Sequence, residues 1–564
     1  MRLFMLRIEP VIPASVIAAV LGACCLAIPG LCVYSISSCS WLGGTGSNDA
    51  ERGIRIQSTG TIVLAANIST ASPGGKTPVL LNGATTASSG AVVRLSSDGK
   101  TVLSVTRVAD SVLDCAIDSL DNIYLAAANQ GAIKLDPSAA TLVYKRAVGG
   151  FCYRIDAGSD GTVAALNATG GNAGSIYVYK ENGDSIGYMP GYQMTQDVVI
   201  SSSLRSVFFL GFQNKNSGCN PVQVAYIKSN AYNGTLKWKD YDWPGNMLDN
   251  CNSAPYVNNM ADTRGYRLNI GRDGVLCCAF ECAGGNHIFR YDPADLSISV
   301  KVVGGDMYHN WSNTKSEHKT FFSRINASTG AYIIGQQFCT RVWNATANRY
   351  DGNAARVNGG AITTDESGNV YIAGPSASGL PIPGWRGYTP KAGQDAYNPF
   401  DSTIYTDGAY LLVMDSALAL RRYCTRLTGN TTQAIDARIV NGKRMIAFGG
   451  KAGKLNSQWL LDLRNAFQPA IGDTTGEGFV AVMIDDLAPG AAVRTPPQYG
   501  SGWNGFSRYP LSRLMAADRI AAAYDLRGCV MYDRSSTAMG SGVYLLKLRD
   551  SGQVYRRCIY ESTY

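Results

Sequence analysis

The residues best suited to acid–base chemistry lie in one short segment near the middle of the 564-residue chain, DMYHNWSNTKSEHK. This segment holds His309, Glu317 and His318, which are two of the three histidines in the chain and a carboxylate. An imidazole and a carboxylate placed side by side can exchange protons with a substrate. We favour a polar aromatic loop on the rim of the fold, and keep these three residues as catalytic candidates.

A second pattern could bind a cation through oxygen atoms. Asp365, Ser367 and Asn369 alternate along the chain as the ligands of a calcium loop do. The same residues belong to a repeated turn pattern described below, so we favour a hairpin turn. Asp365 and Asn369 remain the metal candidates, and we expect no cofactor.

The chain contains 15 cysteines, which suits disulfide bonds in an oxidising compartment. Cys277 and Cys278 are adjacent and would point to opposite faces of a strand, which disfavours a zinc cluster with Cys282. Disulfides or buried thiols are therefore the favoured interpretation. Plausible disulfide pairs by proximity in the sequence are Cys115 with Cys152, Cys219 with Cys251, and Cys529 with Cys558.

Aromatic residues also gather in segments that read as loops. Exposed aromatic side chains beside Asn and Gly suit the recognition of carbohydrate or protein surfaces. They would equally well cap the faces of the fold, and the sequence does not decide between the two. The candidate ligand-binding residues are Tyr308, Trp311, Trp343, Trp385, Tyr388 and Trp503.

Composition and charge limit the classes of protein that fit. Hydrophobic residues make up 46% of the chain, charged residues only 16%, and there are 62 glycines. This balance disfavours a helical bundle, whose exposed faces need charges, and favours many short strands joined by tight turns. Lys and Arg total 50 against 42 Asp and Glu, with no dense basic block, so we expect no nucleic-acid partner.

Internal repeats determine the predicted architecture. One repeated sequence motif, called the first phrase, combines an apolar segment, a polar turn with Gly or Asn, and a run of strand-forming residues that ends in Ala or Gly. AITTDESGNVYIAG at 361 is an example, and Asp-Gly or Gly-Asn supplies the positive φ of a hairpin turn. The phrase starts near residues 53, 115, 154, 197, 267, 361 and 434, with a degenerate copy at 516.

A second phrase, again two strands about a turn, follows most first phrases after a variable gap. It starts near residues 90, 131, 175, 224, 287, 409 and 542. Two hairpins make a four-stranded sheet, and such sheets arranged radially make a propeller. We therefore predict an all-β fold, a β-propeller of seven or eight four-stranded blades spanning 49–564. Loop insertions are expected near 240–265, 305–350, 375–408 and 485–514.

The clearest repeat resembles the secreted bacterial seven-bladed β-propeller repeat family. Residues 361–374 match its first strand pair, Leu380-Pro381 its loop and Gly408–Leu411 its third strand. Residues 434–484 and 89–127 match as well, so the likeness covers about half of the chain. The resemblance implies a seven-bladed propeller, in a family known by architecture rather than by an assigned activity.

The N-terminal segment reads as an export signal. Arg2 and Arg7 precede an apolar stretch that begins at Val11, the order of a signal peptide. Leu21-Gly22-Ala23-Cys24 resembles a bacterial lipidation site at Cys24. A retained anchor helix over 11–36 is the third possibility. We assign 1–48 to this signal or anchor and its linker, and expect a secreted or cell-surface protein with a possible membrane tether.

These observations predict a non-catalytic extracellular or cell-surface scaffold that binds protein or glycan partners through its loops. The alternative is a hydrolase or lyase that acts on extracellular polysaccharide at the central face of the propeller. Such an enzyme needs carboxylates or histidines that converge near the propeller axis. Whether the protein is an enzyme stays open at this level.

Overall fold

The structure is a computed structural model, and most of the residues that it describes lie in β-strands. It describes residues 35–45, 49–168, 173–214, 223–241, 262–282, 319–344, 346, 348–377, 407–418, 421–426, 431–452, 454–455, 458–459, 461, 463–472, 476–485, 520–524, 530–532, 542–548 and 554–560. The chain divides into two units, Met1–Ala491 and Ala492–Tyr564.

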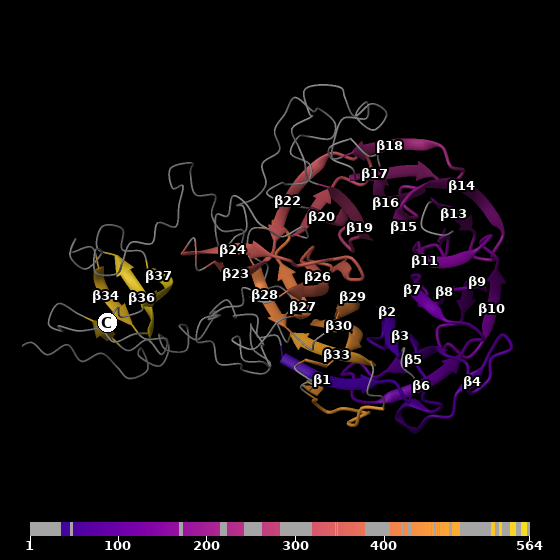
Figure 1. Cartoon of the computed structure of the whole chain (residues 1–564), viewed down its shortest axis with the longest axis horizontal. Coiled ribbons are helices and arrows are strands. Elements are labelled where there is room, and N and C mark those ends of the chain that lie inside the picture. Colours follow the sequence, from indigo (N-terminus) through magenta and orange to yellow (C-terminus); the bar gives the residue numbers. More distant parts are fainter. Residues whose placement is uncertain are drawn as a thin grey trace, which may run out of the picture. The chain divides into compact units, whose positions relative to one another are not determined.

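Seven antiparallel sheets form a ring in the first unit, which confirms the predicted β-propeller and sets the number of blades at seven (Figure 1). Each inner strand contacts the inner strands of both neighbouring blades, and the seventh contacts the first. From blade 1 to blade 7 the inner strands are β2 (Ala50–Ile56), β7 (Val112–Ile117), β11 (Phe151–Ala157), β15 (Thr195–Ser201), β19 (Thr263–Ile270), β25 (Ala361–Thr364) and β29 (Thr431–Val440).

Three further strands complete each blade in the order from axis to rim. The second strands are β3 (Ile62–Asn67), β8 (Ile123–Ala127), β12 (Val163–Ala168), β16 (Ser206–Asn214), β20 (Leu276–Cys282), β26 (Val370–Ala377) and β30 (Lys443–Ala452). The third strands are β5 (Gly90–Leu95), β9 (Gly131–Leu135), β13 (Ala173–Tyr179), β17 (Gln223–Ala231), β21 (Lys319–Ile325), β27 (Asp407–Met414) and β33 (Glu477–Asp485). The outer strands are β6 (Val102–Arg107), β10 (Leu142–Arg146), β14 (Ser185–Gln193), β18 (Leu236–Tyr241), β22 (Tyr332–Phe338), β28 (Arg421–Arg426) and β1 (Ser35–Leu42).

The ring closes through strands from opposite parts of the chain. β1 is the outer strand of blade 7, where it pairs antiparallel with β33, from Ser35 opposite Ile484 to Leu42 opposite Gly478. Pairing covers the edge that β33 would otherwise expose. Residues 35–42 were expected to belong to the export segment and linker, but they form part of the propeller.

Neighbouring blades pack face to face, so both faces of most strands are buried. Strands of this kind read as continuous apolar runs, as in the fully buried β8, IYLAA. One hydrophobic cluster joins Val63 and Val92 of blade 1 to Ile123 and Ile133 of blade 2. Equivalent clusters fill the other interfaces, and this packing explains why few charged residues are needed.

The repeat boundaries agree with the structure in most blades. The seven first phrases from 53 to 434 coincide with the inner strand pairs of the seven blades. Blade 5 differs, because its outer pair is β21 and β22 and not the segment 287–303, which lies outside the described residues. The segment 305–350, expected to be an insertion, therefore supplies two strands of a blade. The reason is that the long gap after β20 separates the two halves of this blade.

The remaining elements are small. β4 (Val79–Leu80) pairs parallel to β6, and η1 (Pro73–Gly75) is a single 3₁₀ turn. Two short hairpins consist of β23 (Thr340–Asn344) with β24 (Arg349–Asn353), and β31 (Lys454–Leu455) with β32 (Gln458–Trp459). No helix in the described part of the chain is long and apolar enough to cross a membrane.

The second unit contains one four-stranded sheet. Its strands are β34 (Ile520–Tyr524), β35 (Val530–Tyr532), β36 (Gly542–Leu548) and β37 (Val554–Tyr560), in the order β35-β34-β36-β37. The repeat phrases near 516 and 542 fall here. The ring itself is complete with seven blades, because the inner strand β29 contacts β2.

Candidate functional site

The inner strands place charged side chains along the propeller axis. In six of these strands the register against the second strand shifts within the first half of the strand. A bulge of this kind changes where the following side chains point. The residues directly after the shift include Asp114 in β7, Arg154 in β11, Asp197 in β15 and Arg267 in β19, so carboxylates and guanidinium groups alternate over blades 2 to 5.

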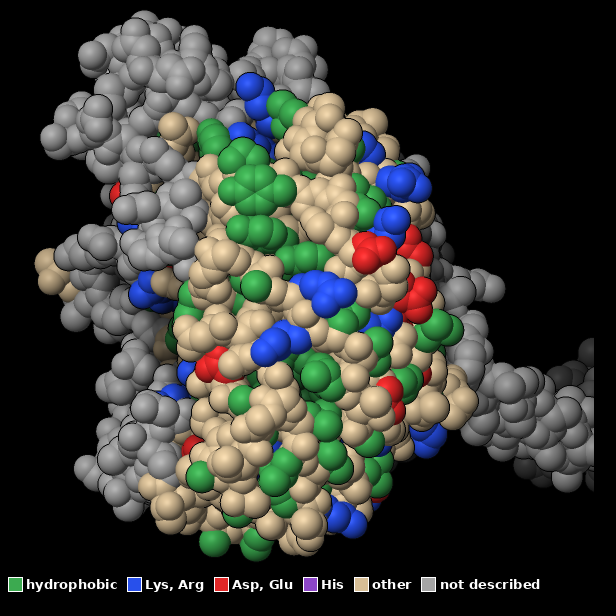
Figure 2. Space-filling view, turned by 90° about the vertical axis from the view of Figure 1, so that its right-hand side faces the viewer, with side chains coloured by type: hydrophobic (Ala, Val, Ile, Leu, Met, Phe, Trp, Pro, Cys, Tyr) green, Lys and Arg blue, Asp and Glu red, His purple; other side chains and the backbone are tan. Residues whose placement is uncertain are grey.

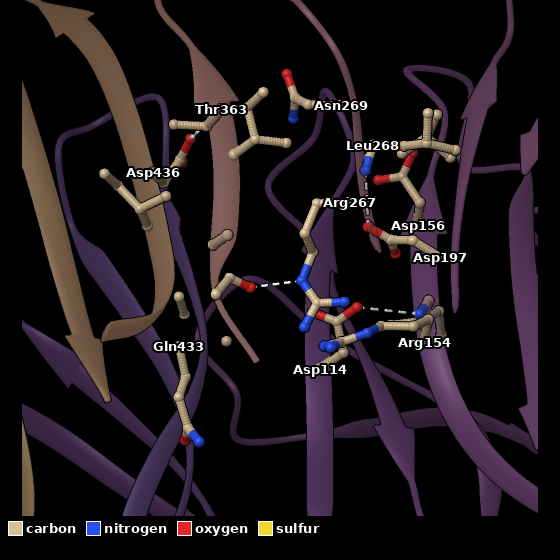
Figure 3. A pocket seen from close by; sticks show the side chains of 18 of the residues that line it. Asp114, Arg154, Asp156, Asp197, Arg267, Leu268, Asn269, Thr363, Gln433 and Asp436 are labelled. Carbon is tan, nitrogen blue, oxygen red and sulfur yellow. Dashed lines mark hydrogen bonds between the residues drawn. The ribbon is translucent and has the colours of Figure 1, made fainter. Parts of the chain in front are cut away.

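These four side chains line a small cavity of about 70 Å³, called the inner cavity (Figure 3). Arg52 and Gln433 contribute from blades 1 and 7. Arg267 is only 6% exposed, and its Nε–H donates to the carbonyl of Gly360 in the segment before β25. The inner cavity is therefore polar and enclosed by residues of several blades.

A wider cavity of about 480 Å³ opens next to it and is called the outer cavity. All seven blades contribute to its wall, chiefly with Ser, Asn, Thr, Asp and Arg. Its lining includes Arg55, Asp118, Ser119, Asp156, Ser159, Ser201, Ser202, Ser203, Asn269, Arg272, Thr363, Asp436 and Arg438. A site formed by every blade depends on the closed ring and not on any single repeat.

Five residues line both cavities and form the layer between them: Arg55, Asp156, Asn269, Thr363 and Asp436. Four of these five residues lie on β2, β11, β19 and β29. Each is two positions further along its strand than the first residue after the register shift. Residues two apart on a strand share a face, which is why both layers face the axis. The axis is thus built of two stacked layers of polar side chains.

The axial aspartates also hold neighbouring blades together. Asp114 accepts from the backbone N–H of Ile155 (3.3 Å), and Asp156 accepts from that of Ile200 (2.8 Å). The same contact recurs from Asp197 to Leu268 (2.9 Å) and from Asp436 to Ile56 (2.8 Å). In each case a carboxylate of one inner strand bonds the inner strand of the next blade.

Burial changes the acidity of two of these groups. Part of the Asp156 side chain faces the cavities, yet surrounding protein restricts its hydration. This burial raises the pKa of Asp156 to about 7, although the Ile200 N–H and Arg55 oppose the shift. Burial also raises the pKa of Asp197, against the charges of Arg267 and Arg154. Asp156 can therefore gain or lose a proton near neutral pH.

The proposed calcium residues form a hairpin turn between β25 and β26. Asp365 is fully buried and accepts hydrogen bonds from the Asn369 side chain (2.8 Å) and the Tyr371 hydroxyl (2.7 Å). Arg444 donates to the same carboxylate at 2.6 Å. Asp118, Asn122 and Tyr124 repeat the turn in blade 2. Protein donors thus occupy the Asp365 oxygens, and no cluster of three or more potential metal ligands occurs among the described residues.

The structure contradicts the proposed disulfide between Cys115 and Cys152, because both residues carry free, buried thiols. Cys115 packs between blades 1 and 2, whereas Cys152 packs between blades 2 and 3, so the sheet of blade 2 separates them. The other two proposed pairs involve residues outside the described side chains. Cys277 and Cys278 also carry free thiols and point to opposite faces, as the sequence argument required.

Most other residues singled out from the sequence lie outside the described part of the structure. Trp343 is the exception, since its backbone lies in β23 opposite Tyr350 of β24. The residues outside the described part are His309, Glu317, His318, Tyr308, Trp311, Trp385, Tyr388, Trp503 and Cys24. Their roles therefore stay predictions.

Comparisons with known proteins give distant similarities only. No family model matches the chain, and no curated protein matches it. A solved structure of Kuenenia stuttgartiensis hydrazine synthase aligns with a TM-score of 0.38 and 11% identity, covering 72% of this chain and 94% of that one. The WD40 β-propeller domain of Doa1 aligns with a TM-score of 0.40 and 10% identity, covering 80% and 96%. At this similarity neither protein informs the function.

The axial residues themselves were missed from the sequence. A usable signal was present, because aligning the repeats on their turns places Asp or Arg at equivalent positions of the inner strands. On the face shown in Figure 2, charged side chains lie among uncharged ones. The two axial cavities, by contrast, each bring several Asp and Arg side chains together.

Proposed function

We propose that this protein is an exported, non-catalytic β-propeller scaffold that binds a protein or glycan partner at the outer cavity. The observation that carries the proposal is the composition of this cavity, to which all seven blades contribute polar side chains. Binding pockets are typically concave and present several convergent polar groups. The rigid ring holds these groups in place without a partner, which lowers the entropic cost of binding.

Export, and with it an extracellular or cell-surface location, is part of the proposal. It is supported by the basic and apolar order of the N-terminal residues, which resembles a signal peptide or anchor. The resemblance of the repeats to the secreted bacterial propeller family supports the same location. Fractionation of expressing cells, with and without residues 1–34, tests it, because retention of both forms in the cytoplasm would contradict export.

A glycan and protein array probed with the full chain tests partner binding. Ser203→Trp places a large side chain in the outer cavity at an exposed position, and Thr141→Trp is a matched control away from it. We expect a bound partner to be lost with Ser203→Trp and retained with Thr141→Trp. Equal binding by both variants would place the partner elsewhere and contradict the proposal.

One observation favours the alternative, a polysaccharide hydrolase or lyase. Asp156 lies in the layer between the two cavities and has a pKa of about 7, which suits a general acid or base at neutral pH. Incubation with acidic and neutral polysaccharides, followed by measurement of new reducing ends, tests this alternative. Release that disappears in Asp156→Asn would support an enzyme and overturn the scaffold proposal.

A further inference from the structure

Four arginines that line the inner cavity have no carboxylate within ion-pair distance in the described structure. They are Arg52, Arg55, Arg154 and Arg267. Two arginines that line only the outer cavity do have ion-pair partners. Arg272 lies 3.2 Å from Asp436, and Arg438 lies 3.8 Å from Asp121. The axial guanidinium groups therefore form a distinct set whose charge is not directly paired.

The neighbouring carboxylates are turned toward backbone amides instead. Asp114 accepts from the N–H groups of Cys115 (2.9 Å) and Ile155 (3.3 Å). Asp197 accepts from those of Val198 (3.0 Å) and Leu268 (2.9 Å). In each carboxylate one oxygen bonds the next inner strand and the other bonds the following amide of its own strand, so both oxygens already have backbone donors.

The arginines consequently retain free donors toward the cavity. A guanidinium carries five N–H donors. Arg55 uses Nη1 for the carbonyl of Ile54 (2.7 Å), and Arg267 uses two nitrogens for the carbonyls of Gly360 and Tyr266. The Nε of Arg154 is buried and has no hydrogen-bond partner among the described residues. Unsatisfied buried donors are costly, so this cavity favours an oxygen acceptor.

Two of these cations also face one another. The side chains of Arg154 on β11 and Arg267 on β19 extend toward each other, with Asp114 beside them (Figure 3). Burial, and then the charge of Arg154, lower the pKa of Arg267. An anionic oxygen between the two guanidinium groups would relieve this repulsion and satisfy the free donors.

We propose that the axial channel binds an acidic oligosaccharide, with a hexuronate carboxylate in the inner cavity held by Arg55, Arg154 and Arg267. The neighbouring sugar rings occupy the outer cavity. This inference rests on the proposed function, and it adds the class of partner and the residues that recognise it. The inner cavity has room for a carboxylate group together with a few waters, since its 70 Å³ is several times the roughly 10–15 Å³ that one water needs.

A carboxylate is favoured over a phosphate monoester by the remaining charges of the channel. Asp114 and Asp197 line the same cavity, so a doubly charged phosphate would meet stronger repulsion than a single negative charge. A carboxylate is also planar, which matches the paired N–H donors of a guanidinium. One negative charge on a planar group is therefore the best match to this site.

A sugar is favoured over an acidic protein segment by the wall of the outer cavity. Protein interfaces have an apolar, often aromatic centre. The outer cavity instead presents the hydroxyls of Ser201, Ser202 and Ser203, and the amide of Asn269. These groups can bond the several hydroxyls of a sugar ring, whereas they offer little apolar surface to a protein.

Calorimetry with the full chain tests the proposal. The probes are trigalacturonate, its carboxyl-reduced neutral counterpart, and a pentaglutamate peptide. Arg154→Gln and Arg55→Gln remove axial cations separately. Arg205→Gln is the control, because Arg205 lines a different cavity and stacks on Tyr232 at the rim.

We expect trigalacturonate to bind, with affinity reduced about 10- to 100-fold in Arg154→Gln and in Arg55→Gln and unchanged in Arg205→Gln. Thermal unfolding shows whether each variant is folded. If Arg154→Gln is unfolded, the affinity of Arg55→Gln for trigalacturonate is the test of the carboxylate site. Equal binding of the neutral trisaccharide, or unchanged affinity in both axial variants, would overturn the carboxylate site but leave glycan binding intact.

The other outcomes separate this inference from the proposed function. Binding of pentaglutamate without any sugar would overturn the assignment to a glycan and indicate a protein partner at the same site. Binding of no probe would overturn the inference. The proposed function is then decided by the array with Ser203→Trp, whose result does not depend on a uronate.

Discussion

The carboxylate of Asp436 accepts a 2.8 Å hydrogen bond from the backbone N–H of Ile56, a residue 380 positions earlier in the chain. The bond joins the inner strand of the last blade to that of the first. Asp436 is 4% exposed and also lies 3.2 Å from Arg272. The ring is therefore closed at the axis by a buried hydrogen bond to a carboxylate as well as at the rim by β1.

Replacement of Asp436 should destabilise the propeller strongly. Asp436→Ala leaves the N–H groups of Ile56 and Ala437 without their acceptor, while Arg272 keeps Glu366 as a partner. Each buried donor left unsatisfied costs about 1–3 kcal/mol. The free energy of unfolding, measured with denaturant, checks this value. Asp184→Ala in an exposed turn is the control, and an equally small change in both variants would contradict a role in closure.

The strand that closes the rim should matter as much. Trp41 of β1 is 4% exposed and belongs to the hydrophobic cluster of blade 7. Trp41→Ala is expected to cost about 3–5 kcal/mol of unfolding free energy, the usual loss for a large buried aromatic side chain. Leu103→Ala is the matched control, because Leu103 is 44% exposed. Similar denaturation curves for the two variants would show that β1 is not needed for stability.

The buried thiols should be protected from alkylation in the native protein and should not be oxidised to a disulfide. Burial raises the pKa of Cys115 and of Cys152, which disfavours the reactive thiolate. We expect alkylation, read by peptide mass spectrometry, to miss both residues in the native protein and to modify both after unfolding without reductant. Modification that needs a reductant would indicate a disulfide instead, and rapid labelling of the native protein would contradict the burial.

The proton on Asp156 should make stability depend on pH. Its pKa in the folded protein is about 7, whereas an unfolded aspartate has a pKa of about 3.9. Between these values the folded chain binds more protons than the unfolded chain, so this contribution to stability is present at low pH and is lost as the pH rises toward and through 7.

The Asp156→Asn variant isolates this effect. We expect its unfolding free energy, relative to the unsubstituted protein, to increase between pH 4.5 and pH 8. Asp184→Asn, in an exposed turn, should show no such trend. A constant difference across this pH range would indicate an ordinary acidity for Asp156.

Much of the architecture was predictable because the repeats are local. A turn such as Asp365–Asn369 carries its own hydrogen-bond partners within a few residues, so a short phrase identifies a hairpin. Repetition of that hairpin then predicted the propeller. The number of blades was less certain, because a phrase near 516 resembles the others but belongs to a sheet with a different strand order.

The features that close and line the ring were not predictable in the same way. β1 pairs with β33, which lies more than 400 residues further along the chain. No feature of residues 35–42 indicates which strand they pair with. Cys115 and Cys152 are close in the sequence, yet one sheet separates them. Sequence distance thus suggested a contact that packing prevents.

The amino-acid sequence by itself determined the class of fold, since alternating turns and apolar strands leave few other ways to bury both faces of each sheet. Only the tertiary structure decided the site. Asp114, Arg154, Asp197 and Arg267 come from four different repeats, and each is an ordinary residue in its own hairpin. They form a channel because a closed ring brings seven inner strands to one axis, where backbone amides bind the carboxylates and leave the arginines open to a ligand.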